Sequence, residues 1–469
     1  MSVESLEEVG VVTRGRAYLN SLAGRRATVV GLARSGVAAA RLLRAAGALV
    51  TGTDAKSLDA LGSEARALAA AGVRLCVGPG AADAFVGADL VVVSPGVPLA
   101  GAALAPARAA GVPIIGELEL GWRALEADTI AITGTNGKTT TTALTGTLLA
   151  EQPRPVLVAG NIGTPLAAHA LTFPADGLVV CEVSSFQLET IDAFRPRVAV
   201  VLNLTPDHLD RHGTFGGYVD AKARIFANQT DADCAVLNAD DEPTAALAAR
   251  TRAHVVWFSR RRALEHGVFV HDGWIAARLN GHAEEICPVS EIFLRGAHNV
   301  ENVLAATACA LWTGIASSTV RRAVARFRGV AHRLEFVRDL RGAQYYNDSK
   351  GTNVASTLRA LESFGEPIVL IAGGLGKGQD FSPLAVAARG RVSHAIVLGA
   401  DGPRLAAALR TGGVPVTEAA SLREAVDAAS GLARPGDVVL LSPACASFDM
   451  FDDYEHRGDV FKQLVERLD

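Results

Sequence analysis

A glycine-rich turn between an apolar run and a helix-like run is the segment best suited to do chemistry. Residues 130–142 read Ile-Ala-Ile-Thr-Gly-Thr-Asn-Gly-Lys-Thr-Thr-Thr-Thr. The two glycines let the backbone approach a polyphosphate, the helix start offers free N–H groups, and the lysine and first threonine suit phosphate and Mg²⁺. The pattern predicts an ATP site, although Ile132 stands where the standard motif has its first glycine. The candidate residues are Gly134, Thr135, Asn136, Gly137, Lys138, Thr139 and Thr140.

Two polar side chains follow further apolar runs. Glu182 lies near the end of the run 178–183, and His208 follows the run 198–204. Ligands of α/β sheets bind at the carboxyl ends of the strands. A carboxylate buried in an apolar strand is costly unless it is paired or bound to a metal. We therefore interpret Glu182 as a Mg²⁺ ligand and His208 as a metal or phosphate ligand, with an ordinary surface histidine as the alternative.

Lys222 lies where a core residue is expected. Helical spacing places it on the face that carries Tyr218, Ile225 and Phe226. One interpretation is a lysine that extends outward to solvent. The other is an amine carbamylated by CO₂, which becomes an anion able to bind Mg²⁺. Because only the neutral amine reacts, this requires burial to lower the pKa of Lys222.

Four polar clusters occur in the last third of the chain. They occupy residues 331–335, 347–353, 373–378 and 442–449, each after a predicted strand or at a predicted domain border. Arg333 and the lysines of these clusters would neutralise phosphates and carboxylates. Each cluster alone is typical of a polar loop. Together with the phosphate-binding turn they favour a cleft between domains.

The composition excludes several classes of protein. With 469 residues, 49% hydrophobic residues and a net charge of −4, nothing favours binding to nucleic acid or to an anionic membrane. The six cysteines lie far apart with no Cys-x-x-Cys pair, which argues against a zinc site or a disulfide framework and favours reduced core cysteines. The first residues lack the apolar core of a signal peptide, and the longest uncharged run contains three prolines. We expect a cytoplasmic protein.

Strand-like and helix-like runs alternate from residue 27 onward, which predicts an α/β protein with parallel sheets. The length favours two or three domains. We expect a Rossmann-like domain over residues 1–115, after an irregular lead-in of ~20 residues, and a central P-loop ATPase domain with a mostly parallel sheet over 116–328. We expect a second Rossmann-like domain over 329–469, after a helical stretch at 299–327. Ala33 replaces a glycine that a dinucleotide-binding turn needs, so a nucleotide-sugar pocket or a structural turn is favoured over NAD binding.

The order of these motifs resembles the Mur ligase superfamily, the ATP-dependent amide ligases of peptidoglycan precursor synthesis. The phosphate loop is shared across that superfamily, whereas residues 182–189, 347–353 and 442–447 are more selective for its glutamate-adding branch. The resemblance implies a monomeric ligase that activates the carboxylate of UDP-N-acetylmuramoyl-L-alanine as an acyl phosphate. Glutamate then captures this group, and ADP and phosphate are released.

The resemblance also implies site residues, with ATP, two Mg²⁺ ions and a carbamate on Lys222 as cofactors. The residues implied to be catalytic are Lys138, Glu182, His208, Lys222 and Lys350, and those implied to hold metal are Thr139, Glu182, His208 and Lys222. The rest of the ATP site would comprise Asn299 and Asn302 at adenine, Arg333 at the phosphates and Asp348 at the ribose. The residues implied to bind glutamate are Thr352, Lys377, Ser447, Phe448 and Tyr454. The residues implied to bind the UDP-sugar are Arg34, Ser35, Asp54, Ser94, Gly96 and Asn161.

Three alternatives stay open at this point. A ligase like folylpolyglutamate synthetase would share the central and C-terminal domains but would not explain the N-terminal block. Other muramyl ligases usually have a histidine motif where this chain has Asp348-Ser349-Lys350. A phosphate-loop switch protein is the alternative from another class. The sequence also leaves open which isomer of glutamate is added.

Overall fold

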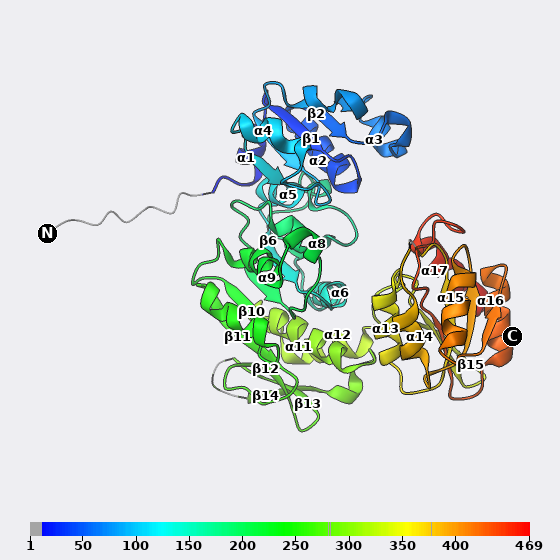
Figure 1. Cartoon of the computed structure of the whole chain (residues 1–469). Coiled ribbons are helices and arrows are strands. Elements are labelled where there is room, and N and C mark those ends of the chain that lie inside the picture. Colours follow the sequence, from blue (N-terminus) through cyan, green and yellow to red (C-terminus); the bar gives the residue numbers. More distant parts are fainter. Residues whose placement is uncertain (1–11, 280, 282, 377) are drawn as a thin grey trace. The chain divides into compact units, whose positions relative to one another are not determined.

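The computed structural model describes residues 12–469 except residues 280, 282 and 377. The described chain folds as two units (Figure 1). Unit 1 covers the described residues up to Glu291 together with Glu301–Val324, and unit 2 covers Ile292–Val300 and Ala325–Asp469. Unit 1 contains two β-sheets and unit 2 contains one. Each unit is described by itself below.

The first sheet of unit 1 is parallel throughout, with strand order β3-β2-β1-β4-β5. Its strands are β1 (Arg26–Val30), β2 (Leu49–Asp54), β3 (Arg74–Val77), β4 (Leu90–Val93) and β5 (Ile114–Gly116). The strand order reverses between β1 and β4, and ligands of such sheets bind beside that point. The loops that follow β1 and β4 therefore face the expected ligand position.

The second sheet of unit 1 has nine strands in the order β14-β13-β12-β11-β10-β9-β6-β8-β7. The strands from β6 to β12 run parallel, and β13 and β14 extend the sheet as antiparallel edge strands. Their bounds are β6 (Asp128–Thr133), β7 (Val156–Gly160), β8 (Leu178–Glu182), β9 (Val198–Val201), β10 (Cys234–Asn238), β11 (His254–Ser259), β12 (Gly267–His271), β13 (Trp274–Arg278) and β14 (Ala283–Pro288). Strand β6 lies between β8 and β9, so the loops after these three strands meet at one edge.

Helices connect the strands of unit 1. They are α1 (Gly15–Ser21), α2 (Arg34–Ala45), α3 (Ser63–Ala67), α4 (Ala105–Ala109), α5 (Glu117–Ala124), α6 (Lys138–Leu149), α7 (Ser185–Leu188), α8 (Leu209–His212), α9 (Phe215–Ala223), α10 (Glu242–Ala245), α11 (Ala297–Trp312) and α12 (Ser317–Arg326). The first residues of α11 belong to unit 2. Strands β8 and β9 are buried along their whole length, which explains their continuous apolar sequence.

Unit 2 is a three-layer α/β structure around a sheet of order β15-β16-β20-β17-β18-β19. Only the β15–β16 pair is antiparallel. The strands are β15 (Glu335–Leu340), β16 (Ala343–Asn347), β17 (Ile368–Gly373), β18 (Val392–Leu398), β19 (Val416–Glu418) and β20 (Val438–Leu441). The helices are α13 (Val354–Glu362), α14 (Ser382–Ala388), α15 (Gly402–Thr411), α16 (Leu422–Leu432) and α17 (Tyr454–Glu466).

Alternate residues of the central strand β17 enter two different cores. Leu370 packs on one face of the sheet with side chains of α13, α14 and α15. Ile371 packs on the opposite face with side chains of α16 and α17, including Phe461. This alternation follows from the period of two along a strand. Helix α17 is thus held on the sheet by its apolar side.

Two expectations from the sequence were wrong. The part of the expected irregular lead-in that is described contains helix α1, because Tyr18 is buried there and Arg14 lies over the Trp122 ring of α5. Residues 1–11 of the lead-in lie outside the described residues. The expected single helical stretch at 299–327 is two helices, because Gly314 takes a left-handed conformation with φ of 90° after α11.

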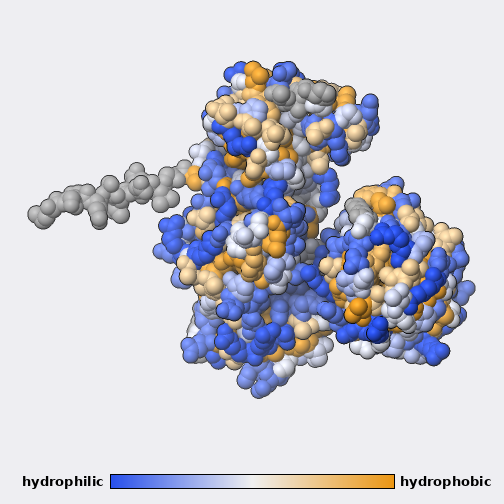
Figure 2. Space-filling model, viewed as in Figure 1, coloured by the Kyte–Doolittle hydropathy of each residue, from blue (hydrophilic) through white to orange (hydrophobic). Residues whose placement is uncertain are grey.

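The cysteines match their expected role. All six are free thiols and five are buried. In the face shown in Figure 2, hydrophobic residues are interspersed with hydrophilic ones in each unit. No helix of the described residues combines the length and the apolar character needed to cross a membrane.

Two buried glutamates begin helix α5, which leads from the first sheet of unit 1 to the second. Glu119 accepts hydrogen bonds from the backbone N–H groups of Asp192, Ala193 and Phe194 at 2.9 Å each. Glu117 accepts from the Ala167 N–H at 2.7 Å, and its Oε2 atom is buried with no hydrogen-bond partner. Burial raises the pKa of Glu117 to about 7. This carboxyl therefore destabilises unit 1 when it is ionised.

We predict that Glu117→Gln makes unit 1 less sensitive to pH. In the parent chain the folded state binds the Glu117 proton more tightly than the unfolded state, so stability falls as the pH rises from about 4.5 to 7. The shift corresponds to a loss on the order of 3 kcal/mol, which the amide avoids. Urea unfolding followed by tryptophan fluorescence measures this, because all four tryptophans lie in unit 1. The exposed control Glu64→Gln should keep the parent's pH dependence. Equal pH dependence of Glu117→Gln and parent would contradict the assignment.

Candidate active site

The predicted phosphate-binding turn joins β6 to α6. Gly137 is the N-cap of α6 with φ of 82°, and Lys138 is the first helical residue. A Cβ atom on Gly137 would meet the side chain of Asn302, and one on Gly134 would lie 3.0 Å from Leu202 Cβ. The first N–H groups of a helix have no partner within it, and Thr139 and Thr140 lie in that first turn. The turn therefore presents backbone donors and hydroxyls, as an anion site requires.

Two lysine ammonium groups converge on this turn. The Nζ atom of Lys138 donates to the carbonyl oxygens of Gly134 and Thr135, at 2.9 Å each. The Nζ atom of Lys222 donates to the same Gly134 oxygen at 2.9 Å and to Thr133 Oγ1 at 3.1 Å. Two lysine nitrogens thus share one carbonyl oxygen, and a positive charge on both of them would be repulsive. An anion bound at the turn would relieve their repulsion.

Lys222 of α9 points inward, as its helical spacing predicts. Its side chain is 1% exposed, and its Nζ atom lies 4.9 Å from the centre of the Tyr218 ring. Burial, with the nearby positive charge of Lys138 as the next cause, holds the pKa of Lys222 well below its usual value. The neutral amine that carbamylation requires is therefore favoured.

Two residues of this site were not identified from the sequence. Tyr218 donates or accepts a hydrogen bond with Thr135 Oγ1 at 3.0 Å, so the ring that covers Lys222 also holds the turn. Asn203, in the loop after β9, accepts from the Asn136 N–H through its side-chain oxygen at 2.9 Å. The spacing of Tyr218 and Lys222 by one helical turn was a usable signal. No sequence signal pointed to Asn203, because its hydrogen bond with Asn136 joins segments that lie far apart in the chain.

Glu182 lies at the end of β8 and is 2% exposed. Its Oε1 atom accepts from Asn161 Nδ2 at 2.8 Å, and its Oε2 atom is buried with no hydrogen-bond partner. An orphaned carboxylate oxygen beside a phosphate-binding turn fits a Mg²⁺ ion. Among the described residues no group of three or more His, Cys, Asp or Glu side chains is placed to hold a metal. Mg²⁺ commonly takes one or two carboxylates and fills its other positions with phosphate oxygens and water.

His208 is exposed and has a left-handed backbone conformation, with φ of 52°. Its ring lies 4.8 Å from the Phe186 ring, and its Nε2 atom lies 3.7 Å from a carboxylate oxygen of Asp207. Phe186 belongs to α7, which follows the Glu182 strand. The structure therefore places His208 against the segment that follows Glu182, and its proposed role as a ligand stays a prediction.

Asn302 of α11 packs on the phosphate-binding turn. Its Oδ1 atom accepts from Thr141 Oγ1 at 3.2 Å. Asn299, one helical turn earlier, donates from Nδ2 to the Arg295 carbonyl oxygen at 2.6 Å. Both side chains are buried, and their predicted contact with adenine stays a prediction.

The residues expected to bind the UDP-sugar fall into two groups. Five of them lie at the carboxyl edge of the first sheet: Arg34 and Ser35 begin α2, Asp54 ends β2, and Ser94 and Gly96 lie in the loop after β4. Both carboxylate oxygens of Asp54 accept backbone N–H groups, from Leu32 at 2.8 Å and Lys56 at 2.9 Å. Arg34 and Gly96 are exposed. Asn161 forms the second group, because its side chain donates to Glu182 in the second sheet of unit 1.

In unit 2, Asp348 and Lys350 occupy the loop after β16. Asp348 is buried and accepts from Ser442 Oγ at 2.7 Å and from the Leu334 N–H at 3.3 Å. Burial raises the pKa of Asp348 to about 6. The Nζ atom of Lys350 lies 5.5 Å from the centre of the Tyr454 ring.

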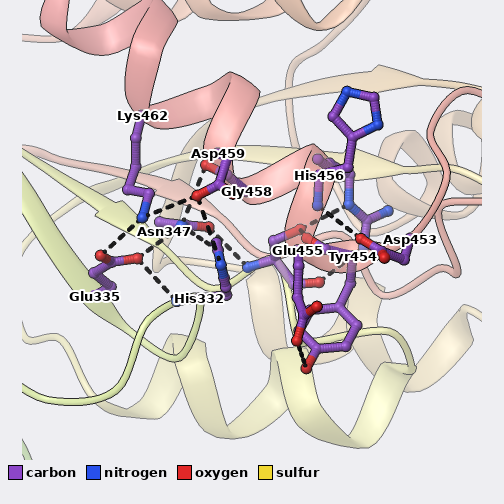
Figure 3. Close-up of polar contacts among 12 residues, drawn as sticks. His332, Glu335, Asn347, Asp453, Tyr454, Glu455, His456, Gly458, Asp459 and Lys462 are labelled. Carbon is purple, nitrogen blue, oxygen red and sulfur yellow. Dashed lines mark hydrogen bonds and ion pairs between the residues drawn. The ribbon is translucent and has the colours of Figure 1, made fainter. Parts of the chain in front are cut away.

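Arg333 is exposed between two residues with left-handed backbones, His332 with φ of 63° and Leu334 with φ of 44°. Figure 3 shows the polar contacts around His332, in which Glu335, Asn347 and residues of α17 surround its turn. Thr352 follows in the loop after β16, and Ser447 and Phe448 lie in the loop after β20. Ser447 is buried and Phe448 is exposed. Lys377 lies outside the described residues.

Three family models match the chain. The Mur ligase MurD-like N-terminal domain matches residues 25–116, the Mur ligase middle domain matches 132–310, and the Mur ligase glutamate ligase domain matches 332–445. Together they span both units.

Curated relatives are similar over nearly their whole length. The UDP-N-acetylmuramoylalanine–D-glutamate ligase of Pelotomaculum thermopropionicum is 50% identical over 96% of this chain and 99% of its own. The ligase of the same name from Acidobacterium capsulatum is 50% identical over 95% of this chain and 96% of its own.

Solved structures share the fold at lower identity. The UDP-N-acetylmuramate–alanine ligase of Thermotoga maritima is 22% identical, with a TM-score of 0.58, over 94% of this chain and 99% of its own. A pseudomurein peptide ligase type C of Methanothermus fervidus is 19% identical, with a TM-score of 0.55, over 95% of this chain and 100% of its own.

We predict that Gly137→Ala weakens binding of ATP. A left-handed backbone costs a residue with a Cβ atom about 1–2 kcal/mol, which corresponds to a ~5- to 30-fold loss of affinity if the turn must keep this shape. Isothermal titration calorimetry with ATP and Mg²⁺ measures the effect. The matched control is Gly216→Ala, where the nearest atom to an added Cβ lies at 3.8 Å. Unchanged affinity of Gly137→Ala would contradict the role of this turn.

Proposed function

Because this chain belongs to the Mur ligase family, we propose that it joins D-glutamate to UDP-N-acetylmuramoyl-L-alanine with hydrolysis of ATP to ADP and phosphate. This reaction is a step of peptidoglycan precursor synthesis. The observation that carries the proposal is the phosphate-binding turn on which Lys138 and Lys222 converge. It is supported by the 50% identity of this chain to a UDP-N-acetylmuramoylalanine–D-glutamate ligase over 96% of its residues. ATP and a nucleotide-linked substrate are compounds of the cytoplasm, where we propose that the protein acts.

The first step activates a carboxylate. The turn at 134–140 and the Lys138 ammonium bind the triphosphate and neutralise its charge. The terminal carboxylate of UDP-N-acetylmuramoyl-L-alanine attacks the γ-phosphorus atom, so that a C–O–P linkage forms and the bond to the ADP oxygen breaks. Mg²⁺, with Glu182 and Thr139 as the residues that would hold it, supplies charge neutralisation between the reacting anions.

The second step forms the amide. The neutral amine of glutamate attacks the acyl carbonyl carbon, and the resulting tetrahedral intermediate expels phosphate, with the proton lost from nitrogen passing to the departing phosphate or to solvent. The positive groups that we assign to this step are Lys350 and Arg333, which would stabilise the phosphate as it leaves. Thr352, Lys377, Ser447, Phe448 and Tyr454 are the residues that we propose for glutamate, on the resemblance alone. The proposed roles are therefore divided between the two units.

Lys222 is proposed to act as a carbamate. Its amine is buried and its low pKa favours the neutral form that reacts with CO₂. The product is an anion beside Lys138, whereas a protonated Lys222 would place a second positive charge there. Conversion to a carbamate would replace this repulsion with attraction and would give Mg²⁺ a further oxygen ligand, with Glu182 as its companion.

We predict that phosphate release depends on both acceptor substrates. The chain with ATP, Mg²⁺, UDP-N-acetylmuramoyl-L-alanine and D-glutamate should release phosphate in step with amide formation. L-glutamate in place of the D isomer should give at most background release. A phosphate assay with mass spectrometry of the product measures both quantities.

The outcomes of this assay separate the alternatives. Phosphate release that needs no acceptor would indicate a nucleotide switch protein and would refute the ligase proposal. Activity with L-glutamate and a folate, but not with the UDP-sugar, would indicate a ligase like folylpolyglutamate synthetase.

We predict that Lys222→Ala lowers ligation on the order of a hundredfold, and that an added short-chain carboxylate partly restores it. The small anion would enter the space left by the side chain and replace the carbamate. Lys138→Ala is the matched control, because its ammonium acts as a cation and a carboxylate should not restore its activity. Full activity of Lys222→Ala without any additive, or equal rescue of both variants, would contradict the carbamate.

A further inference from the structure

Arg457 is a buried arginine in helix α17 that the proposed chemistry leaves without a role. Its side chain is 3% exposed, in a helix whose apolar residues pack on the sheet of unit 2. Among the described residues, no carboxylate forms an ion pair with it. A buried positive charge without a close counter-ion is costly. Its presence at a buried position points to a task other than stability.

The guanidinium of Arg457 binds two loops at once. Its Nε atom donates to Ser349 Oγ at 2.9 Å and its Nη2 atom donates to the Ser349 carbonyl oxygen at 2.8 Å. Its Nη1 atom donates to the Cys445 carbonyl oxygen at 3.1 Å. Ser349 lies after β16 and Cys445 after β20, and these two strands are hydrogen-bonded neighbours. The planar guanidinium group of Arg457 thus fixes the loops at the carboxyl ends of β16 and β20.

Ser349 is also tied to the start of α17 and to its own loop. Its hydroxyl donates to the Tyr454 carbonyl oxygen at 2.8 Å, and its N–H donates to Asn347 Oδ1 at 3.1 Å. The next residue, Lys350, donates its N–H to the His332 carbonyl oxygen at 3.0 Å. The backbone that carries Lys350 is therefore set by contacts that begin at Arg457.

Helix α17 also contacts the loop around Arg333, in which His332 and Leu334 have left-handed backbones (Figure 3). A Cβ atom on Gly458 would collide with the His332 ring, so the glycine allows this ring to approach the helix. Asn347 Nδ2 lies 3.0 Å from His332 Nδ1 and donates to Glu335 Oε2 at 3.0 Å. One turn further along the helix, Lys462 pairs with Glu335 Oε1 at 3.2 Å. Helix α17 thus contacts both loops that carry Arg333 and Lys350.

We infer that α17 is a positioning element, and that Arg457 is the positioning residue that fixes Lys350 and the loop before Ser447. The inference deepens the proposed function and rests on it where activity is concerned. Arg457 touches no reacting group and acts through the Ser349 and Cys445 backbones. Lysine cannot replace it, because an ammonium is a point charge whereas a guanidinium presents five donors in a fixed plane.

The test compares Arg457→Lys with Arg338→Lys in the full chain. Arg338 of β15 binds the other end of α17, donating to the carbonyl oxygens of Val465, Glu466 and Leu468 at 3.2, 3.0 and 3.1 Å. Arg457→Lys should lower kcat for D-glutamate-dependent phosphate release about tenfold or more, with KM for the UDP-sugar within about twofold of the parent. Arg338→Lys should lower the thermal midpoint of unit 2 and leave kcat within about twofold. Equal effects on kcat, or an unchanged kcat in Arg457→Lys, would overturn the inference.

Hydrogen exchange separates failure of this inference from failure of the proposed function. In the ligand-free chain, Arg457→Lys should increase exchange at the amides of Lys350, Gly351 and Ala446 about tenfold, and Arg338→Lys should not. This readout needs no substrate, so it stands whichever reaction the chain performs. Unchanged protection of these amides in Arg457→Lys would refute the positioning role even if ligation is observed.

Lys462→Met provides a variant that should fold readily, because Lys462 is partly exposed. Loss of its pair with Glu335 should loosen the Arg333 turn and raise KM for ATP several-fold. An unchanged KM for ATP would show that the Lys462 pair does not position Arg333. It would thereby refute the proposed role of α17 as a positioning element for both loops.

Discussion

The sharing of one carbonyl oxygen by two lysines is the constraint on which the central site depends. Lys138 and Lys222 each place a side-chain nitrogen 2.9 Å from the Gly134 oxygen, so a positive charge on Lys138 disfavours a second one on Lys222. The fold maintains this arrangement with a buried helix face, a covering Tyr218 ring and a glycine turn. Burial and the charge of Lys138 together explain why the pKa of Lys222 is low. An anion bound beside the two lysines would stabilise this arrangement by balancing their positive charge.

Both units place a buried basic side chain at the carboxyl ends of parallel strands. Unit 1 has Lys222 beside the phosphate-binding turn, and unit 2 has Arg457 beneath the loops after β16 and β20. Buried carboxylates accompany them, with one orphaned oxygen on Glu182 and a raised pKa at Asp348. A sequence selected only for stability would avoid such groups. Their cost is consistent with a reaction that gathers a triphosphate and two carboxylates.

The parts of this structure that follow local rules were predictable. The phosphate-binding turn followed from its glycines and flanking periodicity, and the inward position of Lys222 followed from helical spacing. Other features depend on contacts between distant segments. The hydrogen bonds of Arg457 to Ser349 join residues 108 positions apart, and the Ala167 backbone donor to Glu117 lies 50 positions away. The left-handed backbones of His208 and His332 likewise have no signature in residue type. Local patterns carry no information about such pairs.

Carbon-13 NMR of the chain equilibrated with labelled bicarbonate is the most direct test of the lysine pair. The account predicts one slowly exchanging carbamate resonance in the parent chain, which disappears in Lys222→Met and shows coupling to a lysine side-chain nitrogen when that nitrogen carries nitrogen-15. Saturating bicarbonate that gives no such resonance at a pH where the protein is active would contradict the account.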